Sequence, residues 1–257
     1  MKKVLTIAGS DCSGGAGVQA DIKTITVHGM YAMSAITTLT AQNTTGVASI
    51  YDVSARFIGQ QLDCIFNDIY PDAVKIGMVS NVFAIDMIVQ KLKEYRPPNI
   101  VIDPVMMSST GHSLINDSAK EALVTKLLPL GNIITPNIPE ASVIAEMDIN
   151  NDNDMIYAAK KIHNLTSADV LIKGGHSDTN ANDLLVTSEG TYWFRSPKIL
   201  NPNTHGTGCT LSSAIACELA SGKDIGSSIK SAKAYITNAL KANLNLGHGN
   251  GPLNHMV

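Results

Sequence analysis

A histidine, two glycines, a threonine and a cysteine fill positions 205–209 of the chain, in the order His-Gly-Thr-Gly-Cys. Apolar residues then recur at intervals of four, at Leu211, Ile215 and Leu219, and this spacing predicts an amphipathic helix. The first turn of a helix has unpaired backbone N–H groups and partial positive charge, and glycine lets a ligand approach that backbone closely. Residues 206–209 therefore predict a pocket for an oxyanion or a phosphate, although an ordinary glycine turn fits the pattern equally well.

Cys209 is the residue of this segment with the clearest reactive potential. At the start of a helix the pKa of its thiol is expected to fall, which would make the group more thiolate-like. His205 lies four residues earlier and could hydrogen-bond to it. The alternative is that Cys209 is a small buried hydrophobic residue, as most cysteines are, and Cys217 is expected to be one.

Two carboxylates and a lysine follow apolar stretches elsewhere in the chain. Asp103 ends the β-branched stretch NIVID, and Glu140 follows the stretch NIIT. Such carboxylates can hold Mg²⁺, largely through water, whereas the alternatives are a turn residue before proline and a charge that complements a helix dipole. Lys173 precedes two glycines and could either pair with a nucleotide phosphate or end a strand in solvent.

The elements that could position these residues alternate along the chain, as β-rich apolar segments and amphipathic segments in turn. This alternation predicts an α/β fold, a three-layer α/β/α sandwich around a mostly parallel sheet. A turn at 188–190 predicts a small antiparallel edge, and the lack of a linker or repeat predicts a single domain over residues 1–257. Helices are also expected after the caps Ser54 and Asn81 and from Pro139. We expect strands at 4–8, 33–41, 73–77, 99–103, 132–135, 170–173, 183–187 and 191–195, and helices at 16–28, 117–127, 152–165, 208–221 and 225–246.

The turns after the expected strands are rich in glycine and polar residues. In open α/β sheets, ligands bind at the carboxyl ends of the strands. We therefore expect these turns to gather at one edge of the sheet and to form the functional site there. They read AGSDCSGGAG, TAQNT, KIGM, DPVM, TPNIPE and KGGH.

The composition narrows the class of function. With 257 residues, 44% of them hydrophobic, and a formal net charge of -3, the chain can bury a sizeable core and has no basic footprint for nucleic acid or an anionic membrane. No apolar stretch approaches the roughly 20 residues of a membrane span, the first apolar stretch is too short for a signal peptide, and the cysteines form no CxxC pair. We expect a soluble cytoplasmic protein. It has neither a P-loop nor a GxGxxG motif, so a nucleotide would be bound by another device.

Taken together, seven motifs in this order resemble the hydroxymethylpyrimidine and phosphomethylpyrimidine kinases of thiamine biosynthesis, within the ribokinase-like superfamily. The resemblance spans essentially the whole chain. It implies a ribokinase-like fold and the ATP- and Mg²⁺-dependent phosphorylation of 4-amino-5-hydroxymethyl-2-methylpyrimidine and then of its monophosphate. The motifs are AGSDCSGGAGVQADIKT (8–24), TLTAQNTTGV (38–47), VKIGMV (74–79), VIDPVM (101–106), TPNIPEA (135–141), LIKGGH (171–176) and HGTGCTLSSAIA (205–216).

The resemblance also implies roles for the candidates at the phosphate end of the site. Many ribokinase-like enzymes have an aspartate base where this chain has Cys209, so Cys209 would be the base, with His205 assisting. Asp103 and Glu140 would be associated with magnesium. The anion hole would be formed by Gly206, Thr207, Gly208 and Cys209, and the nucleotide would contact Lys173, Asn137 and Thr207.

At the substrate end, the side-chain amide of Gln42 both donates and accepts hydrogen bonds, which suits the amino and ring-nitrogen edge of an aminopyrimidine. By resemblance the pocket would also be lined by Gly9, Ala16, Asp21 and Met78, although Asp21 could be a structural carboxylate and Met78 a packing residue. Residues 106–114 resemble a lid over the site. A homodimer is expected from the resemblance alone.

Three other functions fit parts of the pattern. A pyridoxal kinase of the same superfamily branch could use Cys209 on the aldehyde of pyridoxal. A Cys-His hydrolase could use Cys209 and His205 without a nucleotide, but it would leave the lysine and magnesium motifs unexplained. A non-catalytic vitamin-binding protein would be stabilised by its ligand without releasing ADP. Cys12, within the first glycine turn, has no expected role.

Overall fold

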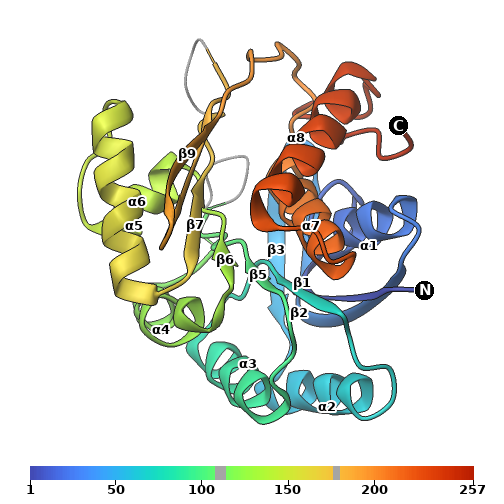
Figure 1. Cartoon of the computed structure of the whole chain (residues 1–257). Coiled ribbons are helices and arrows are strands. Elements are labelled where there is room, and N and C mark those ends of the chain that lie inside the picture. Colours follow the sequence, from blue (N-terminus) through green and yellow to red (C-terminus); the bar gives the residue numbers. More distant parts are fainter. Residues whose placement is uncertain (108–113, 176–179) are drawn as a thin grey trace.

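The computed structural model describes residues 1–107, 114–175 and 180–257. Within these residues nine strands form one sheet in the order β3-β2-β1-β4-β5-β6-β7-β8-β9 (Figure 1). The five pairings from β2 through β1 to β7 are parallel, which confirms the mostly parallel sheet. The strands are β1 (Lys3–Asp11), β2 (Tyr31–Asn43), β3 (Gly46–Asp52), β4 (Ala73–Ile76), β5 (Ile100–Ile102), β6 (Ile133–Ile134), β7 (Asp169–Ile172), β8 (Asp183–Thr187) and β9 (Gly190–Phe194).

Both edges of the sheet are antiparallel, not one. The expected edge is present, since β8 pairs antiparallel with β7 and with β9. At the other edge β2 and β3 form a long ribbon: β2 continues to Asn43, two residues beyond the predicted strand end at 41, so its turn at residues 44–45 includes only the last residue of the expected TAQNT turn. Residues 50–52 of β3 are exposed, so this strand has no buried apolar face by which its sequence could be recognised.

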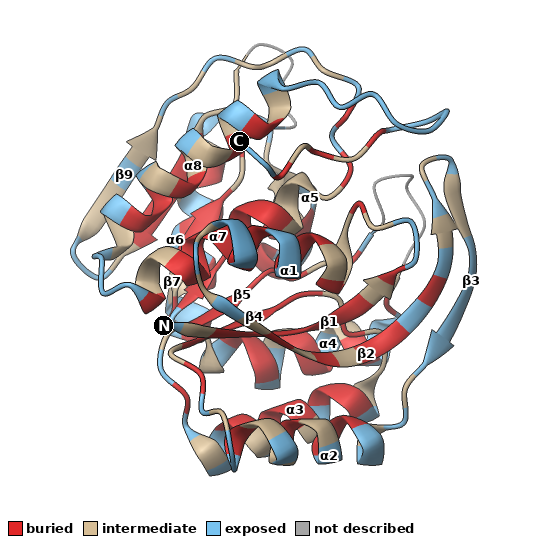
Figure 2. Ribbon diagram, turned by 90° about the vertical axis from the view of Figure 1, so that its right-hand side faces the viewer, coloured by how far each residue is buried: buried red, intermediate tan, exposed pale blue. Residues whose placement is uncertain are grey.

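Helices cover both faces of the sheet, which confirms the three-layer sandwich (Figure 2). Helices α1, α7 and α8 lie on one face and α2 to α6 on the other. Helical turns of π and 3-10 type continue α4 through Leu123–Leu127 and Leu128–Leu130. The helices are α1 (Gly17–Val27), α2 (Ala55–Phe66), α3 (Val82–Tyr95), α4 (Asp117–Ala122), α5 (Ile138–Ala145), α6 (Asp152–Thr166), α7 (Thr207–Ala220) and α8 (Ile225–Lys241).

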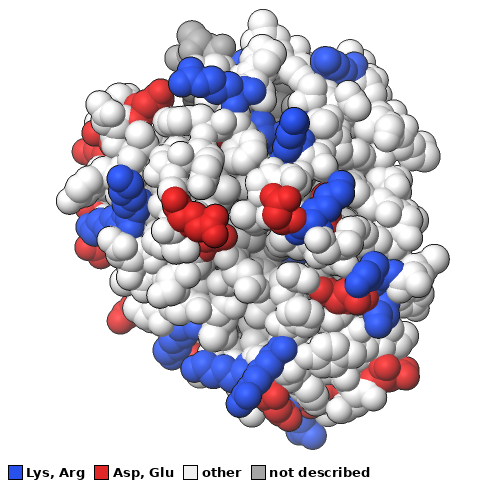
Figure 3. Space-filling view, in the orientation of Figure 1, with Lys and Arg blue, Asp and Glu red and all other residues white. Residues whose placement is uncertain are grey.

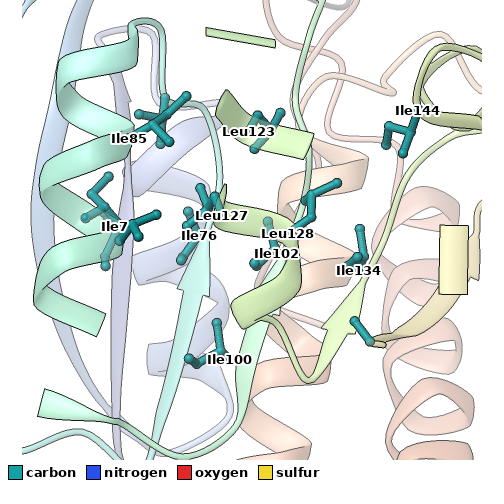
Figure 4. Close-up of a cluster of buried hydrophobic side chains, with 14 of the residues drawn as sticks. Ile7, Ile76, Ile85, Ile100, Ile102, Leu123, Leu127, Leu128, Ile134 and Ile144 are labelled. Atoms are coloured by element: carbon teal, nitrogen blue, oxygen red, sulfur yellow. The ribbon is translucent and has the colours of Figure 1, made fainter. Parts of the chain in front are cut away.

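Alternate residues of the central strands enter two separate hydrophobic clusters. Ile100 and Ile102 of β5 join the cluster beneath α2 to α6, whereas Val101 between them joins the cluster beneath α1, α7 and α8. Figure 4 shows the first cluster, in which Ile102 and Ile134 lie near Leu128. Strands buried on both faces explain why NIVID is a continuous apolar run.

The expected caps are confirmed and one helix end is not. The side chain of Ser54 accepts a hydrogen bond from the third residue of its helix, and that of Asn81 does the same for α3. Helix α8 ends at Lys241, five residues before the predicted end at 246. The side-chain amide of Asn201 donates to the carbonyl of Leu240, and Asn243 adopts φ +45°, so the backbone leaves the helix at this point.

On the face shown in Figure 3, acidic and basic side chains are interspersed, so this face shows no patch of one sign that marks a site. Within the described residues, no helix has the length and apolar character needed to cross a bilayer. The site is therefore located from the pocket and its lining residues.

Candidate active site

A pocket of about 900 Å³ lies at the carboxyl ends of the parallel strands. Its lining includes every residue that the sequence or the family resemblance nominated for the site, with the exception of Asp21. A second hollow, of about 530 Å³, lies near Arg96 and Asn132 at the amino ends of the strands and contains none of them. The nominated residues in the large pocket are Gly9, Ala16, Gln42, Met78, Asp103, Asn137, Glu140, Lys173, His205, Gly206, Thr207, Gly208 and Cys209.

The start of α7 forms one wall of the pocket. Gly206 caps this helix at φ +81°, and a Cβ there would overlap the carbonyl of Gly15, so both the backbone angle and the space require glycine. A Cβ on Gly208 would lie 3.2 Å from Nζ of Lys173 and 3.5 Å from Oδ2 of Asp103. The start of α7 therefore faces Lys173 and Asp103. This arrangement suits an anion site at the helix N–H groups next to a cation site at the carboxylate.

The expected fall in the thiol pKa of Cys209 is wrong. Burial raises the pKa of this thiol above its ordinary value, while the positive charge of Lys75 acts in the opposite direction. Cys209 itself is half-buried and lines the pocket at the third position of α7. In the protein without ligand, the thiol is therefore the dominant form at neutral pH.

Asp103 and Lys173 form a close pair at the centre of the pocket. Nζ of Lys173 lies 2.6 Å from Oδ1 of Asp103, which also accepts a hydrogen bond of 3.2 Å from the Thr135 hydroxyl. Asp103 is only 2% exposed. Oδ2 of Asp103 faces α7, since the Ser212 hydroxyl lies 3.5 Å from it.

Glu140 lies at the start of α5 and is buried beside the same pair. It forms a capping box with Asn137: the Glu140 N–H donates to the Asn137 side chain, and the Asn137 N–H donates to Oε2 of Glu140, each at 2.8 Å. Burial raises the pKa of Glu140 to about 7; the charge of Lys173 opposes this shift and that of Asp103 adds to it. Two buried carboxylates thus share a single lysine.

This donor set fits a magnesium ion. A cation between Asp103 and Glu140 would offset the negative charge that Lys173 leaves uncompensated. In residues 1–107, 114–175 and 180–257 there is no group of three or more His, Cys, Asp or Glu side chains that could hold a metal. Two carboxylates suffice for Mg²⁺, which keeps several waters and binds substrate phosphates.

Elsewhere on the pocket wall, His205 lies between Gln42 and Asp11. Nε2 of His205 lies 3.2 Å from the amide of Gln42 and 2.8 Å from Oδ2 of Asp11. His205 thus faces Asp11 and Gln42 in the ligand-free pocket. Asp11 was not nominated, although its position between a strand and a glycine turn was a usable signal.

The structure gives Asp21 a structural role, the alternative that its sequence context left open. Its carboxylate is wholly buried and accepts hydrogen bonds from Lys75 at 2.8 Å, Thr6 at 2.6 Å and Ser213 at 2.7 Å. These contacts tie β1, β4 and α7 to α1 beneath the pocket. Met78 lines the pocket itself, where its sulfur would lie 3.4 Å from a Cβ on Gly9.

The lid expected at residues 106–114 falls mostly outside the described residues, which omit 108–113. Met106, Met107 and Leu114 are described and line the pocket. The N–H of Leu114 donates to the carbonyl of Met106 at 2.9 Å, so the two ends of the segment meet at the pocket wall.

Comparison with known proteins gives one consistent result. A family model described as phosphomethylpyrimidine kinase matches residues 11–254. The chain is 42% identical to the hydroxymethylpyrimidine/phosphomethylpyrimidine kinase of Haemophilus influenzae, over 99% of this chain and 97% of that protein. It is 46% identical to a thiamine biosynthesis bifunctional protein of Geobacter sulfurreducens, over 99% of this chain but only 52% of that protein, so it spans about half of the length of that relative.

Solved structures show the same likeness. A phosphomethylpyrimidine kinase of Clostridium difficile is 46% identical with a TM-score of 0.84, covering 93% of this chain and 99% of that one. An ADP complex of Bacillus subtilis pyridoxal kinase is 40% identical with a TM-score of 0.91, covering 99% of this chain and 97% of that one. The fold is therefore shared by kinases that are named for two different compounds, a phosphomethylpyrimidine and pyridoxal.

Proposed function

This chain belongs to the phosphomethylpyrimidine kinase family, and we propose that it transfers the γ-phosphoryl group of ATP to 4-amino-5-hydroxymethyl-2-methylpyrimidine and then to its monophosphate. The observation that carries this proposal is the convergence of three features in one pocket. The start of α7 offers backbone N–H groups, Lys173 and the two carboxylates lie against it, and Gln42 lines the same pocket.

The reaction breaks the bond between the γ-phosphorus and its bridging oxygen and forms a bond from that phosphorus to the acceptor oxygen, which releases ADP. Phosphoryl transfer depends mainly on positioning and on stabilising negative charge. The N–H groups of Gly206 to Cys209 are assigned to the transferring group, and Lys173 to a nucleotide phosphate. Apolar residues of α8 that line the pocket, Ile236 and Leu240, suit the nucleotide base.

Asp103 and Glu140 are the residues that would hold Mg²⁺. When bound, the ion would neutralise charge on the phosphate oxygens. Lys173 holds Asp103 in place through the 2.6 Å contact. Glu140 must lose its proton before it can hold the ion, and with a pKa of about 7 it does so near neutral pH.

Cys209 is assigned as the group that takes the proton of the hydroxymethyl acceptor. Because burial raises the pKa of its thiol, this role requires ionisation as the substrates assemble or as the pH rises. His205 contacts Asp11 and Gln42, so we place it with the substrate rather than with the proton.

The deciding experiment measures ADP release with the phosphomethylpyrimidine as sole acceptor, beside pyridoxal in a parallel assay. Turnover of the monophosphate supports the proposal, because a pyridoxal kinase has no reason to phosphorylate a phosphate. The likeness to Bacillus subtilis pyridoxal kinase favours pyridoxal phosphorylation as the second candidate. Turnover of pyridoxal alone would establish that function instead.

Three further properties belong to the same proposal. We propose that the chain is a single kinase domain, that it acts in the cytoplasm, and that it forms a homodimer, the last supported by the family resemblance. The β2–β3 ribbon exposes Leu39, Ile50 and Tyr51, which suits a protein contact. Analytical ultracentrifugation tests the dimer, and a sedimenting species of 27.2 kDa would exclude it.

A further inference from the structure

Two hydrogen-bonding conflicts meet at the side-chain amide of Gln42. Its nitrogen lies 3.2 Å from Nε2 of His205, where two N–H groups would face each other if the ring nitrogen is protonated. Its oxygen lies 3.2 Å from the hydroxyl of Thr40, which also lies 2.9 Å from the carbonyl of Ser10. A hydroxyl has one proton, so Thr40 cannot donate fully to both oxygens.

The contact with Asp11 determines whether Nε2 of His205 carries a proton. Oδ2 of Asp11 lies 2.8 Å from Nε2 of His205 and accepts from the backbone N–H groups of Gly15 at 3.1 Å and Ala16 at 2.9 Å. Burial raises the pKa of Asp11, but hydrogen bonds from His205 and Ser13 outweigh it and lower that pKa to about 2. The carboxylate is therefore ionised and can only accept, so Nε2 of His205 must carry a proton.

One rotation removes the contact between two N–H groups and the double demand on Thr40, and the single N–H of His205 is then shared between Oδ2 of Asp11 and the amide oxygen in a three-centre hydrogen bond. Turning the amide of Gln42 by 180° brings its oxygen to the N–H of His205 and its nitrogen to the hydroxyl oxygen of Thr40. Thr40 can then give its proton to Ser10 and accept from the amide. We propose that Asp11 is a positioning residue of the substrate pocket, which fixes the amide of Gln42 through His205 with its oxygen toward His205 and its nitrogen toward Thr40.

The backbone of Gln42 is held as well. The thiol of Cys12 lies 3.1 Å from its carbonyl oxygen, and its N–H donates to the Cys12 sulfur at 3.3 Å. The register of the β2–β3 ribbon also shifts between Ala41 and Gln42, as at a β-bulge, which re-aims a side chain. With the backbone fixed on both sides, the direction of the amide is the property left for Asp11 to set.

The fixed amide sets which substrate edge the pocket accepts. After the amide of Gln42 has hydrogen-bonded to His205 and Thr40, it retains one oxygen lone pair and one N–H that can bind a substrate in the pocket. This inference rests on the proposed function, because an aminopyrimidine presents an amine donor beside a ring-nitrogen acceptor. A 4-oxo analogue presents the reverse, a carbonyl acceptor beside a ring N–H donor.

The test compares kcat/KM for the 4-amino substrate and its 4-oxo analogue in three proteins. Wild type is expected to prefer the amino compound by at least about a hundredfold, since a site built for a hydrogen bond rejects a mismatched partner. In Asp11→Asn the preference should fall about tenfold or more, because asparagine can donate to His205 and release the amide. Ser13→Ala removes a 2.7 Å hydrogen bond to the other oxygen of Asp11 and should keep the wild-type preference.

A purely structural role of Asp11 predicts another pattern. Both substrates would then lose the same factor in Asp11→Asn, and an unchanged preference would overturn the proposal. If that variant does not fold, the ligand-free wild type decides the question by ¹⁵N NMR of the His205 ring, assigned against His205→Gln. A protonated Nε2 is expected, and an unprotonated Nε2 overturns the proposal. This spectrum needs no substrate, so failure of wild type to phosphorylate the pyrimidine would refute the proposed function separately.

Discussion

The two acceptor oxygens of the proposed reaction differ in their need for a base, and replacing Cys209 by alanine exploits this difference. A hydroxymethyl group must lose its proton as it attacks phosphorus. A phosphate monoester has a second pKa of roughly 6 and is already ionised at neutral pH. If the thiolate of Cys209 is the base, the Cys209→Ala variant should lose the first activity far more than the second.

The expected sizes follow from the position of the thiol. A general base contributes about 10²- to 10⁴-fold, so kcat for the hydroxymethyl acceptor should fall by about that factor. Alanine leaves the backbone N–H groups of α7 in place, so kcat for the monophosphate should fall less than about tenfold. At the ordinary thiol pKa of 9.0, about one thiol in a hundred is ionised at pH 7, and burial makes the fraction smaller. In wild type, kcat for the hydroxymethyl acceptor should therefore rise with pH through the alkaline range.

The assay is ADP release with each acceptor at saturating ATP, over a series of pH values. Cys217→Ala is the matched control, because Cys217 lies on the same helix, is wholly buried and does not line the pocket. Equal losses for the two acceptors in Cys209→Ala would contradict the assignment of the base. So would a rise with pH that persists in the variant.

Three further outcomes are expected. Removing one partner of the wholly buried Lys75–Asp21 pair in Lys75→Met should lower the free energy of unfolding by about 3–5 kcal/mol; a urea titration measures this, and a loss well below about 1 kcal/mol would contradict it. Burial raises the pKa of Glu140 to about 7, so the ionised form is disfavoured in the folded state. The free energy of unfolding of the ligand-free protein should therefore fall as the pH rises from about 4.5 to 7. Denaturant titrations at several pH values measure this, and Glu140→Gln should remove the dependence. Gly206→Ala should abolish ADP release and lower the melting temperature, because alanine opposes φ +81° and would overlap Gly15; a variant with wild-type activity would exclude the tight fit at this helix start.

Local patterns predicted most of the scaffold. Apolar runs marked the central strands because these are buried on both faces, and the side chains of Ser54 and Asn81 marked helix starts through contacts only three residues away. Strand β3 was missed because its residues 50–52 are exposed, so its sequence has no apolar pattern there. It is recognised as a strand only by its pairing with β2. The end of α8 was misplaced because it depends on Asn201, 39 positions from Leu240.

The site was predictable in membership but not in detail. Turns at the carboxyl ends of parallel strands had to meet, and the family motifs added the start of α7, so the thirteen nominated residues that line the pocket could be proposed from the sequence. The partner of Asp21 is Lys75, 54 positions away, and no local pattern reveals such a pair. The thiol pKa of Cys209 was predicted from the helix start alone, whereas burial has the larger effect on it.

The contact between Asp11 and His205 has a consequence for how the protein becomes active. It joins residues 194 positions apart, so it forms only when β1 and the start of α7 have both docked on the sheet. Pairings of such sequence separation are slow, because the entropy of closing the loop is lost before the contact forms. During refolding we expect helical circular dichroism to return before the pocket can bind a ligand. Recovered ADP release therefore reports complete folding, whereas recovered helicity does not.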